Sequence, residues 1–264
     1  MDLGLKGKTA IVTGSARGIG RVIAHTFAEE GANVVFADIL AEDAQKAAEE
    51  TKSLGVGTLG IKVDISNAQM VDDMVKATVD KFGKVDILVN NATIIAPAIF
   101  FVDEKVEDVE REVKVIYLGT LNCMRSAFKY MTEQNSGAIV NILSDSARVG
   151  DMRMGNYAGC KAGIGGISRS ISREVARYHI RVNCVSPSMT VTELGKARRE
   201  DEKQKVGDEK FQELQGKRLK VYPLGRLGEP QDIANMVVFL ASERASWITG
   251  QTVSVNGGYA IGPW

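Results

Sequence analysis

Residues 8–28, KTAIVTGSARGIGRVIAHTFA, decide the fold of this chain. The apolar run at 8–13 predicts a short buried strand, and residues 21–28 follow a helical pattern. Between them stand Gly14, Gly18 and Gly20, spaced Gly-x-x-x-Gly-x-Gly. A strand, a glycine turn and a helix point the helix N-terminus at a phosphate, and glycines let the backbone approach it closely. A second strand at 33–37 runs into Asp38, eighteen residues past Gly20, as a dinucleotide-binding fingerprint requires.

Outside this unit, predicted strands and helices alternate along the whole chain. Such alternation predicts a parallel sheet covered on both faces, that is, an α/β fold with a single Rossmann-type, doubly wound domain over residues 1–264. We expect about seven strands, near 8–13, 33–37, 58–63, 86–90, 137–142, 181–185 and 251–255. We expect helices near 19–30, 41–53, 67–82, 104–131, 155–178 and 230–242.

The composition fits one buried domain and argues against several kinds of partner. The chain has 264 residues, 44% of them hydrophobic, and its Lys+Arg and Asp+Glu counts are both 33. This balance suggests neither nucleic acid nor a membrane surface as a partner, and no apolar run reaches membrane-spanning length. The N-terminal MDLGLKGKTA does not resemble a signal peptide. Cys123, Cys160 and Cys184 lack metal-ligand spacing, so we expect no metal and a reducing, cytoplasmic location.

A tyrosine and a lysine four residues apart form the candidate catalytic pair. Tyr157 and Lys161 share one helix face, and a nearby ammonium favours the ionised phenol and lowers its pKa. The pair could then act as an acid and base near neutral pH. Taken alone, the same spacing also fits an exposed helix pair. Ser144 precedes Tyr157 by thirteen residues, and Ser146 is a nearby alternative hydroxyl.

These motifs resemble those of the short-chain dehydrogenase/reductase family. The matching stretches are TGSARGIG at 13–20, NNAT at 90–93, Ser144, YAGCK at 157–161, SPS at 186–188 and VNGG at 255–258. They lie in the family order along nearly the whole chain. The resemblance implies a nicotinamide cofactor, Tyr157 as the acid/base, Lys161 on the nicotinamide ribose and Ser144 orienting the substrate oxygen. It also implies cofactor contacts from Gly14, Arg17, Gly18, Ile19, Gly20, Asp38, Asp64, Ile65, Asn91, Tyr157, Lys161 and Thr190.

The choice between the two nicotinamide cofactors rests on Asp38. A carboxylate at this strand end accepts hydrogen bonds from ribose hydroxyls and repels a 2′-phosphate, which favours NAD. Arg17 argues for NADP, because relatives that bind NADP often carry a basic residue there, but Ile39 adds no second cation. The resemblance places Asp64 and Ile65 beside the adenine, Asn91 along the cofactor and the Thr190 backbone at the carboxamide. Asp64 could also be an N-cap for the helix that follows.

Four positions depart from the family pattern. Thr93 replaces the glycine of NNAG, Ser188 the glycine of PG, and Asn256 the aspartate of DGG. Ile116 stands three residues before Gly119, where relatives place an asparagine that holds a water behind the lysine. Its loss puts the proton relay in doubt but leaves hydride transfer possible.

These observations lead to two expected functions. The first is an NAD(H)-dependent oxidoreductase that interconverts a secondary alcohol and a ketone, and the second is a nucleotide-binding regulatory or scaffold protein. The charged segment at 190–221 would form a substrate lid, or else a solvated helical excursion. Its cations could meet an anionic tail such as that of an acyl-CoA: Lys196, Arg198, Arg199, Lys217, Arg218 and Lys220. The helices near 104–131 and 155–178 resemble those with which relatives build tetramers, so we expect a homotetramer.

Overall fold

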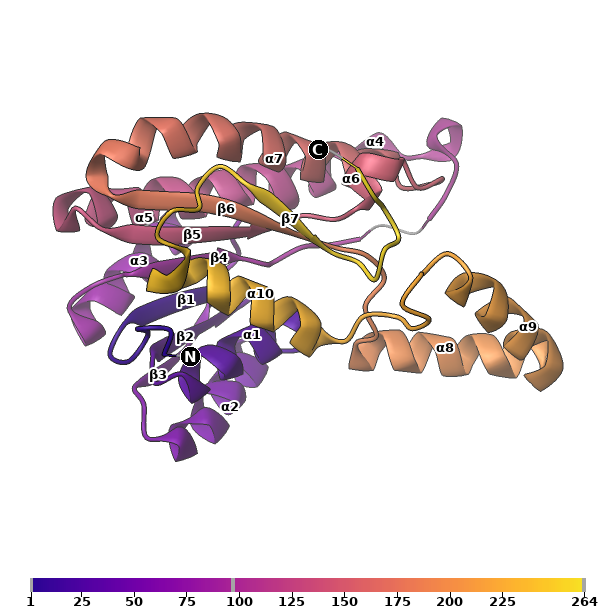
Figure 1. Ribbon diagram of the computed structural model, residues 1–264, viewed down its shortest axis with the longest axis horizontal. Helices are drawn as coiled ribbons and strands as arrows, with labels where there is room; N and C mark the ends of the chain where they lie inside the picture. Colours follow the sequence, from indigo (N-terminus) through magenta and orange to yellow (C-terminus); the bar gives the residue numbers. More distant parts are fainter. Residues whose placement is uncertain (1, 96–97, 263–264) are drawn as a thin grey trace.

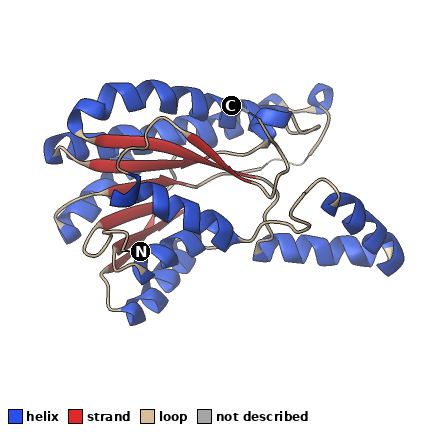
Figure 2. Cartoon of the chain, in the orientation of Figure 1, coloured by secondary structure: helices blue, strands red, loops and turns tan. Residues whose placement is uncertain are grey.

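The computed structural model of the chain describes residues 2–95 and 98–262, without the side chains of residues 194, 196–198 and 202. It is an α/β domain built on one seven-stranded sheet with helices on both faces (Figures 1 and 2). This confirms the fold class expected from the alternating pattern.

The strands are all parallel and run in the order β3-β2-β1-β4-β5-β6-β7. Their bounds are β1 Thr9–Thr13, β2 Asn33–Asp38, β3 Thr58–Lys62, β4 Ile87–Asn90, β5 Gly137–Ile142, β6 Ile180–Pro187 and β7 Thr252–Val255. The chain builds outward from β1 to β3 and then returns to place β4 on the other side of β1. In open α/β sheets, ligands bind beyond the carboxyl ends of the strands at such a change of direction, here β1 and β4.

The helices cover the sheet in two layers. Their bounds are α1 Gly18–Glu29, α2 Ala41–Thr51, α3 Ala68–Phe82, α4 Val106–Glu112, α5 Gly119–Gln134, α6 Ser146–Val149, α7 Gly155–Val175, α8 Glu193–Val206, α9 Asp208–Leu219 and α10 Pro230–Ala241. Four short 3₁₀ turns lie at Lys52–Leu54, Phe101–Asp103, Ala176–Tyr178 and Glu243–Ala245. Each layer shields one apolar face of a sheet whose strands are buried on both sides.

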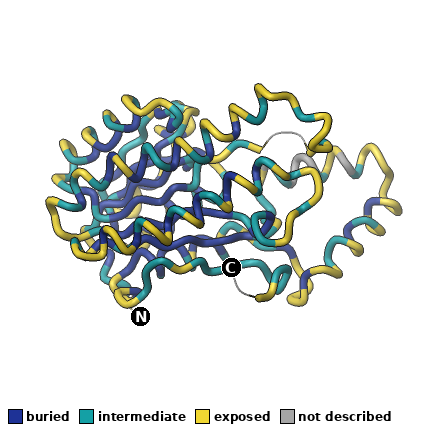
Figure 3. Tube along the Cα trace, turned by 90° about the horizontal axis from the view of Figure 1, so that it is seen from above, coloured by how far each residue is buried: buried dark blue, intermediate teal, exposed yellow. Residues whose placement is uncertain are grey.

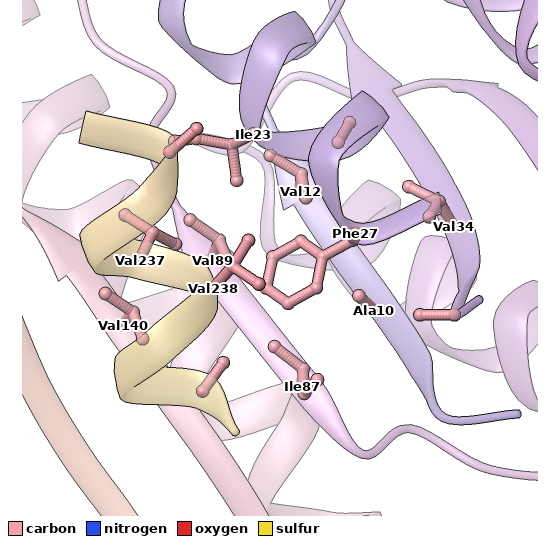
Figure 4. Packing of buried hydrophobic residues seen from close by; sticks show 14 of the residues in the cluster. Ala10, Val12, Ile23, Phe27, Val34, Ile87, Val89, Val140, Val237 and Val238 are labelled. Atoms are coloured by element: carbon pink, nitrogen blue, oxygen red, sulfur yellow. The ribbon is translucent and has the colours of Figure 1, made fainter. Parts of the chain in front are cut away.

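The first layer is the better filled, and Figure 4 shows its centre. Phe27 of α1 and Val237 and Val238 of α10 pack over Val12 and Val89, all fully buried or nearly so. Burying a side chain of this size contributes about 1.5–3 kcal/mol. The second layer packs α3, α5 and α7 against the opposite face, around residues such as Met74 and Met124. The two layers fix β1, β4 and β5, so the loops at their carboxyl ends stand on rigid supports.

The helix expected near 104–131 is interrupted. Between α4 and α5 lies a π-helical segment, Val113–Leu118, in which the backbone hydrogen bonds are widened. A Cβ on Gly119, where α5 begins, would lie 2.8 Å from the Ile65 side chain, so a larger residue would require Ile65 to move. Ile116, within this interruption, is fully buried in a cluster with residues of α7. Such π-bulges frequently occur at functional sites.

The segment at 190–221 forms α8 and α9, which extend away from the sheet (Figure 1). Thr192 caps α8 by accepting from the Gly195 amide at 3.1 Å, and Gly207, with φ 81°, turns the chain into α9. Only Phe211 and Gln215 are buried among the described side chains of these two helices. Figure 3 shows them as a largely exposed arm. The segment is thus helical and largely exposed, and its role as a substrate lid stays a prediction.

The described part of the chain can be assessed for membrane-spanning helices and for metal-binding clusters. Across residues 2–95 and 98–262, no helix has the length and apolar character needed to cross a membrane. The same residues contain no group of three or more His, Cys, Asp or Glu side chains placed to hold a metal ion. Cys123, Cys160 and Cys184 are unpaired and buried.

Candidate active site

The glycine turn has the shape that a dinucleotide needs. Gly14 has φ 65°, and a Cβ on it would lie 2.7 Å from the Ala92 Cα. A Cβ on Gly20 would lie 2.2 Å from the Gly14 carbonyl oxygen, so neither position tolerates a side chain. Arg17, the N-cap of α1, makes no side-chain capping bond, which leaves the first amides of α1 available to an anion. Ile19 lies half-buried in this first turn. The residues present fit a pyrophosphate.

Asn91 supports the turn from the neighbouring strand. Its Nδ2 donates to the carbonyl oxygens of Thr13 at 3.0 Å and Gly14 at 2.9 Å. The Thr13 hydroxyl in turn accepts from the amides of Asn91 and Ala92, both at 3.1 Å. The family resemblance predicted that Asn91 lies along the cofactor. In the structure, its side-chain nitrogen donates to the glycine turn. Asn91 therefore fixes the loop that would hold a cofactor.

Asp38 lies half-buried at the end of β2, beside the glycine turn. Its Oδ2 accepts from the Ala16 amide at 2.9 Å, and its Oδ1 accepts from the Leu40 amide at 3.0 Å. These two bonds hold the carboxylate in one orientation. Arg17 is exposed, and Ile39 is 58% exposed. The carboxylate is thus the fixed charge at this edge, while the arginine is a surface side chain.

The remaining expected cofactor residues occupy the same edge of the sheet. Asp64 is half-buried and accepts from the Ser66 amide at 2.9 Å. The N-cap of α3 is Asn67, whose side chain accepts from the Met70 amide at 3.2 Å, so the alternative interpretation of Asp64 as the cap is wrong. Ile65 is buried at the π-helical junction. Thr190, on the far side of the crevice, pairs with Gly228 and donates its hydroxyl to the Ser188 carbonyl at 3.1 Å.

The structure brings the three expected catalytic side chains together. Helix α7 carries Tyr157 and Lys161, both buried, and Ser144 follows the end of β5. The Lys161 Nζ lies 5.7 Å from the centre of the Tyr157 ring and donates to the Ile142 carbonyl at 2.7 Å. A side-chain hydrogen bond joins Ser144 to the Tyr157 phenol. Two hydroxyls therefore converge on one point, as needed to hold a substrate oxygen.

Burial, and not the lysine, controls the acidity of Tyr157. Loss of solvent raises the pKa of Tyr157 to about 12, which the hydrogen bonds from Ser144 and Thr93 only partly offset. Burial also lowers the pKa of Lys161 to about 8. The expectation that Lys161 lowers the phenol pKa is therefore wrong for the protein without cofactor. The physical reason is that both groups lie in a poorly solvated interior, which disfavours the charged form of each.

Two residues beside Tyr157 were not identified as site residues from the sequence. Thr93 was treated as a tolerable change from glycine, yet its hydroxyl hydrogen-bonds the phenol and lowers the phenol pKa. Glu112, at the end of α4, is only 4% exposed and raises the pKa of both Tyr157 and Cys160 by its negative charge. The only feature of the sequence that could have pointed to Glu112 as a site residue is its place four residues before Ile116.

The surroundings of the Ile116 side chain are apolar, as expected for an isoleucine. The side chain is fully buried in a cluster with Leu143, Tyr157, Cys160 and others. The Ile116 carbonyl accepts the Thr120 hydroxyl at 2.7 Å. The nearest asparagine in the sequence, Asn122, donates instead to the Ile65 carbonyl at 3.0 Å.

The departures at Ser188 and Asn256 belong to one polar cluster behind the site. Asp145 is fully buried and accepts from Ser186 at 2.7 Å, from Ser254 at 3.1 Å and from Asn256 Nδ2. An aspartate at 256 would bring two carboxylates into contact, whereas the asparagine amide donates a proton. Ser188 donates to the Asn256 carbonyl at 3.2 Å. The changes from the family pattern are therefore matched to the presence of Asp145.

Several cations of the segment at 190–221 bond to side chains of the same segment. The Arg199 guanidinium donates to Gln215 at 2.7 Å, and Lys217 pairs with Glu213 at 2.6 Å. The side chains of Lys196 and Arg198 lie outside the described part of the chain. A hollow of about 580 Å³ lies at the base of the lid, lined by Arg199 and Leu219 among others.

Comparison with known proteins agrees with this geometry. Residues 14–260 match the family model described as enoyl-(acyl carrier protein) reductase. The chain is 38% identical over 252 residues to the 3-oxoacyl-[acyl-carrier-protein] reductase FabG of Staphylococcus epidermidis, covering 95% of this chain and 98% of the relative. It is 38% identical over 260 residues to the (2S)-[(R)-hydroxy(phenyl)methyl]succinyl-CoA dehydrogenase subunit BbsD of Thauera aromatica, covering 98% and 99%.

A solved structure gives the same result for the fold. A protein of Sinorhizobium meliloti described as a short-chain alcohol dehydrogenase superposes with a TM-score of 0.89 at 30% identity, covering 98% of each chain. The glycine turn, the Ser144–Tyr157–Lys161 arrangement and these matches along the length of the chain agree. The chain belongs to the short-chain dehydrogenase/reductase family.

Proposed function

We propose that this protein is an NAD(H)-dependent oxidoreductase that interconverts a secondary alcohol and a ketone. The observation that carries the proposal is the convergence of Ser144, Tyr157 and Lys161 at the carboxyl end of the sheet, on the same edge as the glycine turn. Members of this family use a nicotinamide cofactor, which accepts or donates the hydride when bound.

The three side chains divide the work at the substrate oxygen. Ser144 and Tyr157 hold the oxygen between their hydroxyls, and Tyr157 gives or takes its proton. Because the pKa of Tyr157 is about 12, its phenol carries a proton at neutral pH and is prepared to donate to a carbonyl. Alcohol oxidation needs the phenolate, so we expect it to be favoured by alkaline pH. The Lys161 ammonium would hold the nicotinamide ribose and stabilise the phenolate.

The preference for NAD rests on Asp38. Its carboxylate is fixed by the Ala16 and Leu40 amides at the place where the family fingerprint puts the adenosine ribose. A 2′-phosphate there would meet this fixed negative charge. Arg17 at the glycine turn is a cation that opposes the preference, and its exposed side chain makes no capping bond to hold it in place.

The substrate class is an alcohol or ketone on an acyl chain. The relatives support this, because their names specify 3-oxoacyl groups on a carrier protein and a hydroxylated succinyl-CoA. The lid from about 190 to 221 would cover that chain. Since several lid cations are matched by neighbouring side chains, any contact with an anionic tail would have to displace those partners.

We further propose a homotetramer in the cytoplasm. Apolar side chains remain exposed on the surface around α4 and the π-helical segment, including Phe101 at 73%, Val102 at 88% and Val106 at 66%. Burial of this surface against a second copy would remove apolar area from water. The three unpaired buried thiols fit a reducing compartment.

A cofactor and substrate screen tests the proposal. The purified protein is mixed with NAD and a panel of secondary alcohols, including 3-hydroxyacyl thioesters, and NADH formation is followed at neutral and alkaline pH. Steady turnover that Tyr157→Phe abolishes supports the proposal. Tight NAD binding with no turnover across the panel would instead favour a regulatory or scaffold function, the alternative raised by Ile116.

A further inference from the structure

A chain of hydrogen bonds leads away from Tyr157 on the side opposite Lys161. The Ser144 side chain lies close enough to the Tyr157 phenol to lower its pKa. The Ser144 hydroxyl donates to the Ser146 hydroxyl at 3.1 Å, and the Ser146 hydroxyl donates to Asp151 Oδ2 at 2.7 Å. Three consecutive contacts thus connect the phenol to a carboxylate that the family resemblance assigns no role.

The direction of each bond follows from the donors available. An ionised carboxylate only accepts, so the single proton of Ser146 points to Asp151. Ser146 must then accept from Ser144, whose own single proton points to Ser146. The Ser146 amide occupies one lone pair of Ser144 at 3.3 Å, which leaves one lone pair for the phenol proton of Tyr157. With no substrate oxygen in the site, the Ser144 and Ser146 protons therefore both point outward, toward Asp151.

The outer end of this chain reaches water. Asp151 is half-buried, and both of its neighbours, Gly150 and Met152, are exposed. The inner end is buried, with Tyr157 9% exposed and Ser146 8%. The path therefore crosses from the closed interior to the surface in two hydroxyl steps.

Among the neighbouring titratable and charged groups, Tyr259 bonds to Asp151, whereas the nearby arginines contact other groups. Tyr259, after β7, donates its hydroxyl to Asp151 Oδ1 and stacks on Tyr222 with ring centres 5.3 Å apart. Asp145 lies close enough to act on Tyr259, and burial together with these carboxylates raises the pKa of Tyr259, which stays a proton donor. Arg148 of α6 is directed to Ser254 and to the carbonyls of residues 260 and 262. Arg153 lies over the Phe100 ring, 4.3 Å from its centre.

We propose that Ser146 and Asp151 conduct the catalytic proton between Tyr157 and solvent through Ser144. The inference rests on the proposed alcohol–ketone activity. In alcohol oxidation, the phenolate first takes the hydroxyl proton of the substrate. The phenol proton then moves to Ser144, the Ser144 proton moves to Ser146, and the Ser146 proton moves to Asp151, which releases it to water. Three O–H bonds form as three break, and no other reactant is needed.

The hydrogen bonds present after this transfer stabilise the phenolate. After the protons have moved, the Ser144 hydroxyl points inward and donates to the regenerated phenolate. That is the arrangement in which the Ser144 bond lowers the phenol pKa. Ketone reduction runs the same steps inward. The path offers a route for the proton where Ile116 supplies no polar side chain behind Lys161. Ser146 and Asp151 do not contact the substrate in this scheme. They affect the reaction by carrying the proton to and from Tyr157 through Ser144.

The experiment compares Asp151→Asn and Ser146→Ala with the unmodified protein in alcohol oxidation with NAD. Asp151→Asn keeps the size of the side chain but removes the group that takes the proton. We expect kcat at neutral pH to fall roughly tenfold to a hundredfold in both variants, with KM for the alcohol and the Kd of NAD within about twofold. The loss should shrink at high pH, where hydroxide removes the proton directly. Formate should partly restore Asp151→Asn, because a small carboxylate can enter from solvent.

The controls separate the possible outcomes. Asp80→Asn, on the exposed face of α3, removes the same charge and should leave kcat and the pH profile unchanged. A merely structural loss at Asp151 would lower kcat at all pH values and would not respond to formate. Wild-type kcat and an unchanged pH profile in Asp151→Asn and Ser146→Ala would overturn the proton path. Absence of turnover in the unmodified protein would contradict the proposed function itself.

Discussion

Replacing Asp38 by asparagine should change which nicotinamide cofactor the protein prefers. The two carboxylate oxygens accept from two different amides, Ala16 at 2.9 Å and Leu40 at 3.0 Å, so the charge stays at the ribose position. Two unit charges about 5 Å apart interact by ~3 kcal/mol at an effective dielectric constant of about 20. That energy corresponds to roughly a hundredfold in affinity. We therefore expect the unmodified protein to bind NADH roughly a hundredfold more tightly than NADPH, and Asp38→Asn to remove most of this difference.

The substitution also has a cost that the structure specifies. Asparagine offers one oxygen where aspartate offers two, so its amide nitrogen would face the Ala16 or Leu40 amide, donor against donor. An unpaired N–H of this kind costs about 1–3 kcal/mol, and a lower melting temperature should accompany the change in preference.

Fluorescence titration with NADH and NADPH measures the two affinities, and thermal unfolding measures the cost. Arg17→Ala is the matched variant, because Arg17 is the cation of the glycine turn that would favour a 2′-phosphate. It should leave the affinity for NADH nearly unchanged. Equal or tighter binding of NADPH by the unmodified protein, lost in Arg17→Ala, would refute the argument from Asp38.

Three other predictions follow from the site. Tyr157→Phe should reduce turnover by at least about a hundredfold while NAD binds normally, and near-normal rates in this variant would exclude the phenol as the acid/base. Ser144→Ala should lower kcat with the same cofactor affinity. Because the pKa of Lys161 is about 8 in the folded chain against its ordinary 10.5, unfolding above pH 8 takes up a proton. The contribution of Lys161 to the free energy of unfolding should therefore rise between pH 8 and 9, by at most about 1.4 kcal/mol per pH unit, and Lys161→Met should remove this rise in urea titrations. Ile116→Asn should move the pH optimum of alcohol oxidation toward neutral at the expense of stability, since it places an amide in an apolar cluster; superimposable pH–rate profiles would mean that this position does not limit the proton relay.

The fold could be predicted because its signals are local. The period of the hydrophobic pattern and the length of each apolar segment separate strands from helices. The glycines at 14 and 20 are required by contacts within a few residues or with the segment that follows the adjacent strand. The resemblance then fixed the places of Ser144, Tyr157 and Lys161, which the structure brings together. The π-helical interruption before Gly119 was not predicted, because helical periodicity continues across it and only the packing against Ile65 reveals it.

Other features depend on the three-dimensional surroundings. The direction of the Tyr157 pKa shift was predicted wrongly, since the sequence shows the lysine four residues away but not the loss of solvent around both groups. Thr93 and Asp151 lie 64 and 6 residues from Tyr157 in the chain, and nothing in their spacing indicates a shared hydrogen-bonded site. Asn67, not Asp64, caps α3, a difference of one helical turn that capping preferences alone do not settle.

The arm formed by α8 and α9 has a consequence for how this protein can diversify. Its two helices pair charges with each other, bury few of their own side chains and join through Gly207. The free energy that keeps the sheet folded is therefore stored elsewhere. A protease cut at Gly207 should release the arm from its helical state while leaving the sheet intact. For the same reason, residues 193–219 can accumulate substitutions, or be exchanged with those of another family member, with little loss of foldability. Under the proposed role of the arm as a substrate lid, new substrate preferences would arise there while the rest of the domain stays unchanged.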